Sequence, residues 1–143
     1  MTSINILLVE DSPEDADLAR IVLARGPLSY DLHVASDGPA ALAYLRREGS
    51  HSEAPRPRLV LLDWNLPGMH GSEVLRMIKE DEALRTIPVV VLSTSQSPED
   101  VDRAYDLHAN GYITKPAELD QYMETIRGLE NFWFQTAKLP ENP

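Results

Sequence analysis

Five short apolar runs alternate with longer segments of helical period along this chain, and no other feature constrains its fold as strongly. The runs cover residues 4–9, 32–35, 59–62, 89–92 and 111–114. Runs that are apolar throughout are typical of strands covered on both faces, and strands that alternate with helices form parallel sheets. The sequence therefore predicts an α/β fold with five parallel strands and five helices.

Proline and acidic residues mark the expected starts of two helices. Ser12 and Ser97 are each followed by a proline and then by two acids. Serine is a favoured N-cap, proline fits the first helical position, and acids stabilise the positive end of the helix dipole. We therefore expect each serine to cap a helix.

Apolar spacing of three and four residues predicts which helix faces enter the core, whereas residues 48–58 lack periodicity and are expected to form a surface loop. The predicted faces are Leu18, Ile21, Val22 and Arg25 in the first helix, Val74, Leu75 and Ile78 in the third, and Leu119, Tyr122, Ile126, Leu129 and Trp133 in a last helix from about Glu118.

Length and composition limit the classes of function. A chain of 143 residues is expected to form one domain, 1–143, with 138–143 as a flexible tail. The absence of cysteine excludes disulfides and thiolate metal sites, and a formal net charge of −10 argues against a general nucleic-acid binder. Without a signal peptide or a long apolar run, the expected location is cytoplasmic, away from membranes.

Polar residues follow four of the five runs at the point where each run ends. They are Glu10 and Asp11, Asp63, Ser93, and Lys115. In an open parallel sheet, ligands bind at the carboxyl ends of the strands, so these side chains are expected to meet at one edge. Each alone is more simply interpreted as a cap or turn residue. Since serines already supply the caps, the carboxylates are left without a structural role.

Three carboxylates about 5 Å apart would repel by about 3 kcal/mol per pair at an effective dielectric near 20. A hard divalent cation with oxygen ligands would offset this repulsion, and Mg²⁺ suits one or two carboxylates plus a phosphate oxygen. Carboxylates, a metal, a lysine and a hydroxyl are also the groups that phosphoryl transfer to a carboxylate nucleophile requires. The sequence therefore predicts a magnesium-dependent phosphoryl site.

The pair Glu10-Asp11 and the segments 63–71, 92–94 and 111–116 match, in order and spacing, the signature of a known family. Over essentially its whole length the sequence resembles the receiver domains of bacterial two-component response regulators, which are CheY-like. This resemblance implies a flavodoxin-like, doubly wound sheet in the strand order 2-1-3-4-5. It also implies a signalling phosphoacceptor that catalyses only its own phosphorylation and dephosphorylation.

The resemblance implies a role for each site residue. Asp63 would accept a phosphoryl group from a phosphohistidine of a sensor histidine kinase. Asp11, Asp63 and the backbone carbonyl of Asn65 would hold Mg²⁺, with Glu10 acting through a bound water.

Lys115 would pair with the phosphoryl oxygens, and its peptide bond to Pro116 would be cis. Ser93 would turn its hydroxyl toward the phosphoryl group and Tyr112 would rotate inward. These movements would remodel the surface formed by the fourth helix, fifth strand and fifth helix.

A finer resemblance is to single-domain receivers that partner phytochrome-type kinases, including bacteriophytochromes. It rests on the long loop before the third strand, on 110–116, and on the closing segment 131–134 followed by 139–140. It implies a homodimer formed through the fourth helix, fifth strand, fifth helix and C-terminus. If Trp133 points inward, Phe132 or Phe134 must point elsewhere, and an exposed Phe would suit such an interface. Packing of the tail against the body of the protein is the alternative.

Two other functions compete with this one. The first is an aspartyl-nucleophile phosphatase, although the second carboxylate of its Asp-x-Asp motif is here Asn65. The second is a degenerate receiver that acts only as a scaffold. The crowded charge at Glu10, Asp11, Asp63 and Lys115 argues against a scaffold, which has no use for it.

Overall fold

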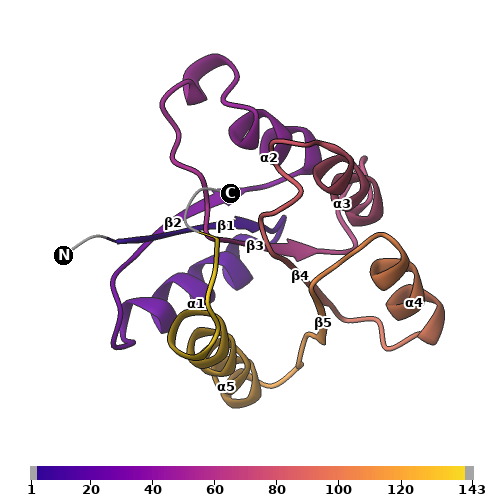
Figure 1. Cartoon of the computed structure of the whole chain (residues 1–143). Helices are drawn as coiled ribbons and strands as arrows, with labels where there is room; N and C mark the ends of the chain where they lie inside the picture. Colours follow the sequence, from indigo (N-terminus) through magenta and orange to yellow (C-terminus); the bar gives the residue numbers. More distant parts are fainter. Residues whose placement is uncertain (1–2, 141–143) are drawn as a thin grey trace.

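The computed structural model describes residues 3–140, which form one five-stranded parallel sheet with helices on both faces (Figure 1). The strand order is β2-β1-β3-β4-β5, and every neighbouring pair is parallel. The predicted flavodoxin-like fold is therefore confirmed. The strands are β1 (Ile4–Val9), β2 (Tyr30–Ala35), β3 (Leu59–Asp63), β4 (Val89–Ser93) and β5 (Gly111–Thr114). The helices are α1 (Pro13–Ala24), α2 (Gly38–Leu45), α3 (Gly71–Glu80), α4 (Pro98–Asp106) and α5 (Leu119–Glu130).

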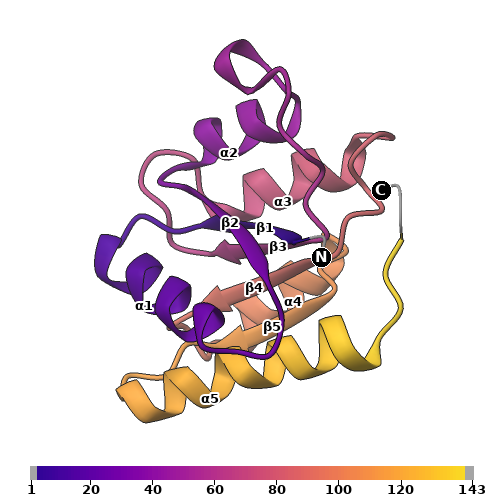
Figure 2. The same cartoon turned by 90° about the vertical axis from the view of Figure 1, so that its left-hand side faces the viewer.

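The sheet separates two hydrophobic cores. α1 and α5 lie side by side on one face, and α2, α3 and α4 cover the other (Figure 2). Every residue of β3 and of β4 is buried. Successive side chains of a strand point to opposite faces, so a strand buried on both faces has to be apolar throughout. This requirement explains why these two interior strands are the most visible in the sequence.

The predicted bounds of β1 and β5 are confirmed, whereas the other three strands are longer than predicted. β2 begins two residues earlier, at Tyr30, and β3 and β4 each include one more polar residue. Those residues are Asp63, which pairs with Leu92, and Ser93, which pairs with Thr114. Two candidate site residues are therefore fixed by the sheet itself rather than by a loop.

Helix faces were predicted correctly for α3 and wrongly in part for α1 and α5. Val74, Leu75 and Ile78 are all buried. In α1, Ile21 is 48% exposed, and the buried residues are Ala16, Ala19, Val22 and Leu23. Small residues allow the helix axis to lie close to the sheet, so the alanines take the inner face. In α5, Leu119 is 55% exposed because it is the first helical residue, at the rim of the sheet.

Ser12 and Ser97 occupy the N-cap positions of α1 and α4, as predicted, but only Ser12 caps its helix with its side chain. The Ser12 side chain accepts the amide of Asp15, whereas Ser97 makes no cap hydrogen bond with its side chain. Instead the Ser95 hydroxyl donates to Asp100 at 2.5 Å and accepts the Ser97 amide at 3.2 Å. The loop at 48–58 contains one short 3₁₀ turn, Gly49–His51.

The C-terminal segment continues α5 as a π-helical stretch, Asn131–Thr136. Trp133 packs against the core beneath α5, as predicted, and Phe132 is 53% exposed. Phe134 packs against Tyr30, with ring centroids 5.5 Å apart. Of the predicted flexible tail, 138–140 has no regular secondary structure and 141–143 lies outside the described residues. No helix within residues 3–140 has the length and apolarity needed to cross a bilayer.

The buried carboxylate of Glu130 joins the end of α5 to β2. It accepts hydrogen bonds from the Tyr30 hydroxyl at 2.6 Å and from Arg127 at 3.0 Å. We expect Tyr30→Phe to lower the free energy of unfolding by about 1–2 kcal/mol, because a buried acceptor loses one of its partners. Urea denaturation would measure the change. Tyr105→Phe on α4, where the side chain is half exposed, is the control and should change stability little. An equal effect of the two substitutions would contradict this role for Glu130.

Candidate functional site

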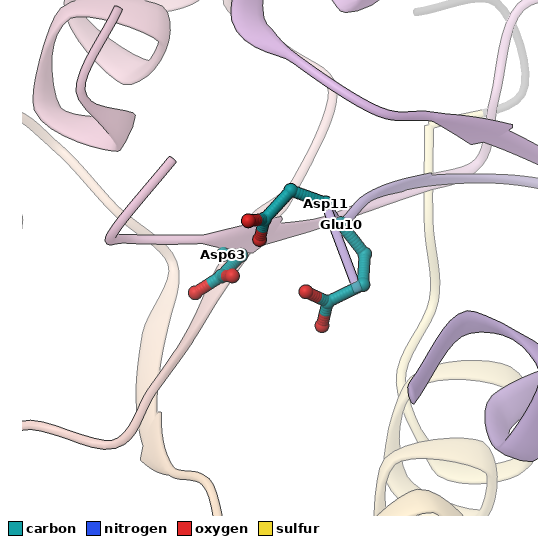
Figure 3. A group of neighbouring side chains, drawn as sticks. All are labelled: Glu10, Asp11 and Asp63. Atoms are coloured by element: carbon teal, nitrogen blue, oxygen red, sulfur yellow. The ribbon is translucent and has the colours of Figure 1, made fainter. Parts of the chain in front are cut away.

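Three carboxylates meet at the carboxyl edge of the sheet, where the sequence predicts them. Glu10 and Asp11 follow β1, and Asp63 is the last residue of β3 (Figure 3). One oxygen from each side chain lies within 4.8 Å of those of the other two. Glu10 and Asp63 are buried, whereas Asp11 is exposed. The cluster is therefore a solvent-accessible site with a buried floor.

The loop 64–70 after β3 folds back so that the start of α3 lies against Asp63. Gly71 begins α3, and its amide donates to the carbonyl of Trp64 at 2.9 Å. A Cβ atom at Gly71 would lie 2.6 Å from the carbonyl oxygen of Asp63 and 2.8 Å from backbone atoms of Trp64. Only glycine allows the start of α3 to approach the end of β3 this closely.

We expect Gly71→Ala to lower the free energy of unfolding by about 2–3 kcal/mol, because the new methyl group would overlap backbone atoms that cannot rotate away. Urea denaturation of the purified variant would test this. Gly128→Ala is the matched control: a Cβ there meets nothing within 4 Å, and in α5 it should stabilise by about 0.5–1 kcal/mol. Similar effects at the two glycines would contradict the close approach at Gly71.

Lys115 supplies the positive charge beside the cluster. Its Nζ donates to Glu10 Oε1 at 2.6 Å and to Asp15 Oδ2 at 3.0 Å. Burial lowers the pKa of Lys115, but the hydrogen bonds to Glu10 and Asp15 outweigh it and hold that pKa above its ordinary value. Lys115 is therefore positively charged at neutral pH.

Burial raises the pKa of Glu10 to about 7, since its carboxylate is removed from water; the hydrogen bond from Lys115 opposes the shift, and the charge of Asp63 adds to it. One ammonium faces four carboxylates here, including Asp15. The negative charge is therefore in excess, and it is carried by hard oxygen donors, which are the ligands that Mg²⁺ and Mn²⁺ prefer. The donor set of Glu10, Asp11 and Asp63 thus fits a divalent cation.

The other predicted site residues occupy the loops and strands around the cluster. Asn65 lies two residues beyond Asp63, and its amide donates to Asp63 Oδ1 at 3.4 Å. Ser93 is fully buried at the end of β4, and its Oγ accepts the amide of Ser95 at 3.1 Å. The Tyr112 hydroxyl donates to the Ser95 carbonyl at 2.9 Å. Ser93 and Tyr112 therefore contact the same residue of the loop between β4 and α4.

One expectation about this region is wrong, and one residue was missed. The peptide bond between Lys115 and Pro116 is not cis, as residues 3–140 contain no cis peptide, and trans is the favoured isomer. Asp15 appeared in the sequence only as an acid of the first helical turn, yet it pairs with Lys115. The position of that turn, directly after the strand end at Asp11, was the signal that could have found it. Among the described residues, neither Ser93 nor Lys115 hydrogen bonds to Asp63.

Comparisons with known proteins agree with this fold and site. A family model for the response regulator receiver domain matches residues 6–127. The chain is similar to the response regulator Rcp1 of Synechocystis sp., with 45% identity over 135 residues that cover 94% of this chain and 92% of Rcp1.

Two solved structures are also similar to this one. The phosphorylated cyanobacterial phytochrome response regulator RcpA has a TM-score of 0.94 and 47% identity, covering 98% of this chain and 100% of RcpA. The Mn²⁺-bound form of Rcp1 has a TM-score of 0.91 and 44% identity, covering 96% of this chain and 99% of that one. The family model and these relatives span nearly all of the sheet and the acidic cluster. The resemblance noted in the sequence is confirmed: the chain belongs to the response regulator receiver domain family.

Proposed function

We propose that this protein is the phosphoacceptor of a two-component system and that Asp63 receives the phosphoryl group from a phosphohistidine of a sensor histidine kinase. The observation that supports this most directly is the approach of Glu10, Asp11 and Asp63 to within 4.8 Å, with Lys115 beside them. An oxygen of Asp63 forms a bond to phosphorus as the bond between phosphorus and the histidine nitrogen breaks. The electron pair of the broken bond leaves with the imidazole.

The residues that would hold Mg²⁺ are Asp11, Asp63 and the backbone carbonyl of Asn65, with Glu10 acting through a water. The ion would neutralise charge on the phosphoryl oxygens during transfer. The exposure of Asp11 leaves a path to the cluster from solvent. The similar protein Rcp1 has been solved in a Mn²⁺-bound form, which supports the proposal that this chain binds a divalent metal.

In this proposal Ser93 and Tyr112 convert phosphorylation into a change of surface. The hydroxyl of Ser93 turns toward the phosphoryl group and gives up its bond from the Ser95 amide. Tyr112 then loses its acceptor as the Ser95 loop moves, and its ring turns inward. Both side chains contact Ser95, which supports a coupled movement of the β4–α4 loop. The surface of α4, β5 and α5 would thus differ between the two states, as a switch requires.

The proposed partners are a phytochrome-type histidine kinase and a second copy of this chain. Similarity to RcpA, a cyanobacterial phytochrome response regulator, supports the kinase type. Exposed Tyr105 on α4 and Phe132 after α5 support a homodimer through α4, β5, α5 and the C-terminus. The net charge of −10 disfavours nucleic acid as a partner, and we place the protein in the cytoplasm, where such kinases present their phosphohistidine.

Intact-mass spectrometry after incubation with acetyl phosphate would test the proposed function. We expect one phosphoryl adduct with Mg²⁺ and none when EDTA removes the metal, and peptide mapping should assign the adduct to Asp63. Inorganic phosphate would be released no faster than the adduct decays, whereas a phosphatase would release it continuously from external phosphoesters. A protein that forms no adduct with acetyl phosphate or with a phosphorylated kinase would instead be a scaffold.

A further inference from the structure

Lys115 has a second acidic partner that lies outside the three-carboxylate cluster. Its Nζ is 3.0 Å from Asp15 Oδ2, on α1, as well as 2.6 Å from Glu10 Oε1. The side chain of Lys115 is 9% exposed and that of Asp15 is 37% exposed. The ammonium is therefore held between the strand end at β1 and the first turn of α1.

The backbone of Asp15 is held on two sides, which places its side chain beside Lys115. Its amide donates to the Ser12 side chain at 3.3 Å, which caps α1. Its carbonyl accepts a hydrogen bond from the buried Tyr122 of α5 at 3.4 Å. Asp15 and Lys115 also line one wall of an open hollow of about 330 Å³ between α1 and the loop that leads to α5.

An ammonium group has three N–H donors, and carboxylates occupy two of those of Lys115. Within the described residues, Lys115 makes no hydrogen bond to Asp63. On the proposed function, its Nζ would shift from the α1 side toward Asp63 to meet an incoming phosphoryl oxygen. A charge-assisted hydrogen bond to Asp15 opposes that movement, because such bonds are stronger than neutral ones.

We propose that Asp15 is a positioning residue that restrains Lys115 on the α1 side and thereby limits the rate at which Asp63 gains a phosphoryl group. This role rests on the proposed function. With acetyl phosphate as donor, an oxygen of Asp63 bonds to phosphorus, the bond from phosphorus to the acetyl oxygen breaks, and acetate leaves with the electron pair. Lys115 can stabilise the charge on the transferring oxygens only when its Nζ faces them.

The test compares the rate of adduct formation, by intact mass, for wild type and three variants at saturating Mg²⁺. Asp15→Asn keeps the shape but not the charge and should accelerate phosphoryl uptake about three- to tenfold, the difference between a charged and a neutral hydrogen bond. Asp15→Glu keeps the carboxylate, so its rate of phosphoryl uptake should be close to that of wild type and slower than that of Asp15→Asn. Asp17→Asn is the matched control, since Asp17 is an exposed acid on the same helix. It should change the rate less than twofold, as surface charges contribute little.

A second measurement is independent of phosphorylation. In the metal-free protein, the Nζ protons of Lys115 should exchange with water faster in Asp15→Asn than in wild type or Asp17→Asn, as followed by ¹⁵N NMR. A purely structural role for Asp15 would slow uptake by disturbing the site and would not accelerate it.

The outcomes separate the two proposals. If wild type forms the Mg²⁺-dependent adduct but Asp15→Asn is no faster, or Asp17→Asn is equally accelerated, the restraint by Asp15 is wrong and the proposed function stands. If wild type forms no adduct, the proposed function fails and the role of Asp15 fails with it.

Discussion

Asp63→Asn is expected to abolish the phosphoryl adduct completely while making the metal-free protein more stable. The amide of asparagine is too weak a nucleophile to form the acyl phosphate, so no adduct should appear at any Mg²⁺ concentration. The same change removes one of three carboxylates that lie within 4.8 Å of one another. Part of their mutual repulsion is offset by Lys115, so we expect a gain of about 1–2 kcal/mol in the free energy of unfolding.

The two effects of Asp63→Asn are measured separately. Intact mass after incubation with acetyl phosphate reports the adduct, and urea denaturation in EDTA reports stability. Asp102→Asn, which changes an exposed acid of α4, is the control and should keep the adduct and the stability of wild type. An adduct that persists in Asp63→Asn would place the phosphoacceptor elsewhere. A loss of stability would show that the Asp63 side chain stabilises the fold and that repulsion from Glu10 and Asp11 does not dominate.

The sequence predicts the sheet well because parallel strands that are buried on both faces must be apolar at nearly every position. β3 and β4 are apolar until their last residue, and that residue is the polar group of the site. β2 was predicted too short because it is the edge strand, where Tyr30 and the exposed Asp31 replace an apolar pair. The ends of a strand are clear in the sequence when the strand is fully buried, and they become ambiguous when the strand lies at the solvent-exposed edge of the sheet.

The helices were harder to predict because distance to the sheet, rather than apolarity alone, selects the inner face. Ile21 is more apolar than Ala19, yet Ala19 is fully buried and Ile21 is half exposed. An alanine allows close contact between helix and sheet. A sequence pattern that weights large apolar residues therefore predicts a buried helix face that is displaced by about one residue from the real one.

The acidic cluster was predictable and its cationic neighbour only in part. The carboxyl ends of β1 and β3 lie next to each other in any sheet of this order, which brings Glu10 and Asp11 to Asp63. Which acids Lys115 would contact depends on its side-chain conformation and on the placement of α1 against α5. The interpretation of Asp15 as a helix-dipole acid was therefore incomplete, since the same carboxylate also pairs with Lys115.

Lys115→Ala is expected to have the largest effect on stability of any single substitution at the site. The variant would leave Glu10, whose side chain is 2% exposed, without its hydrogen-bonded cation. Removing one partner of a buried ion pair costs about 3–5 kcal/mol when the remaining group stays charged. We therefore expect the metal-free variant to lose about 3 kcal/mol of unfolding free energy at pH 8.

The loss should be smaller at pH 6, and this pH dependence identifies Glu10 as its cause. Burial raises the pKa of Glu10 to about 7 even with Lys115 present, and removing Lys115 takes away a charge that lowers it. A carboxyl whose pKa is higher in the folded than in the unfolded protein destabilises the fold as pH rises from its unfolded pKa, 4.5, through its folded pKa. Protonation at pH 6 removes the unpaired charge and restores stability.

Urea denaturation in EDTA at the two pH values would measure both effects, and a second substitution would assign them. Glu10→Gln in the Lys115→Ala background removes the unpaired charge and should recover most of the loss at pH 8 while abolishing the difference between pH 8 and pH 6. Lys138→Ala changes an exposed lysine outside the site and should leave stability unchanged. If the double variant were as unstable at pH 8 as Lys115→Ala alone, the lysine would stabilise the fold through its packing rather than by pairing with Glu10.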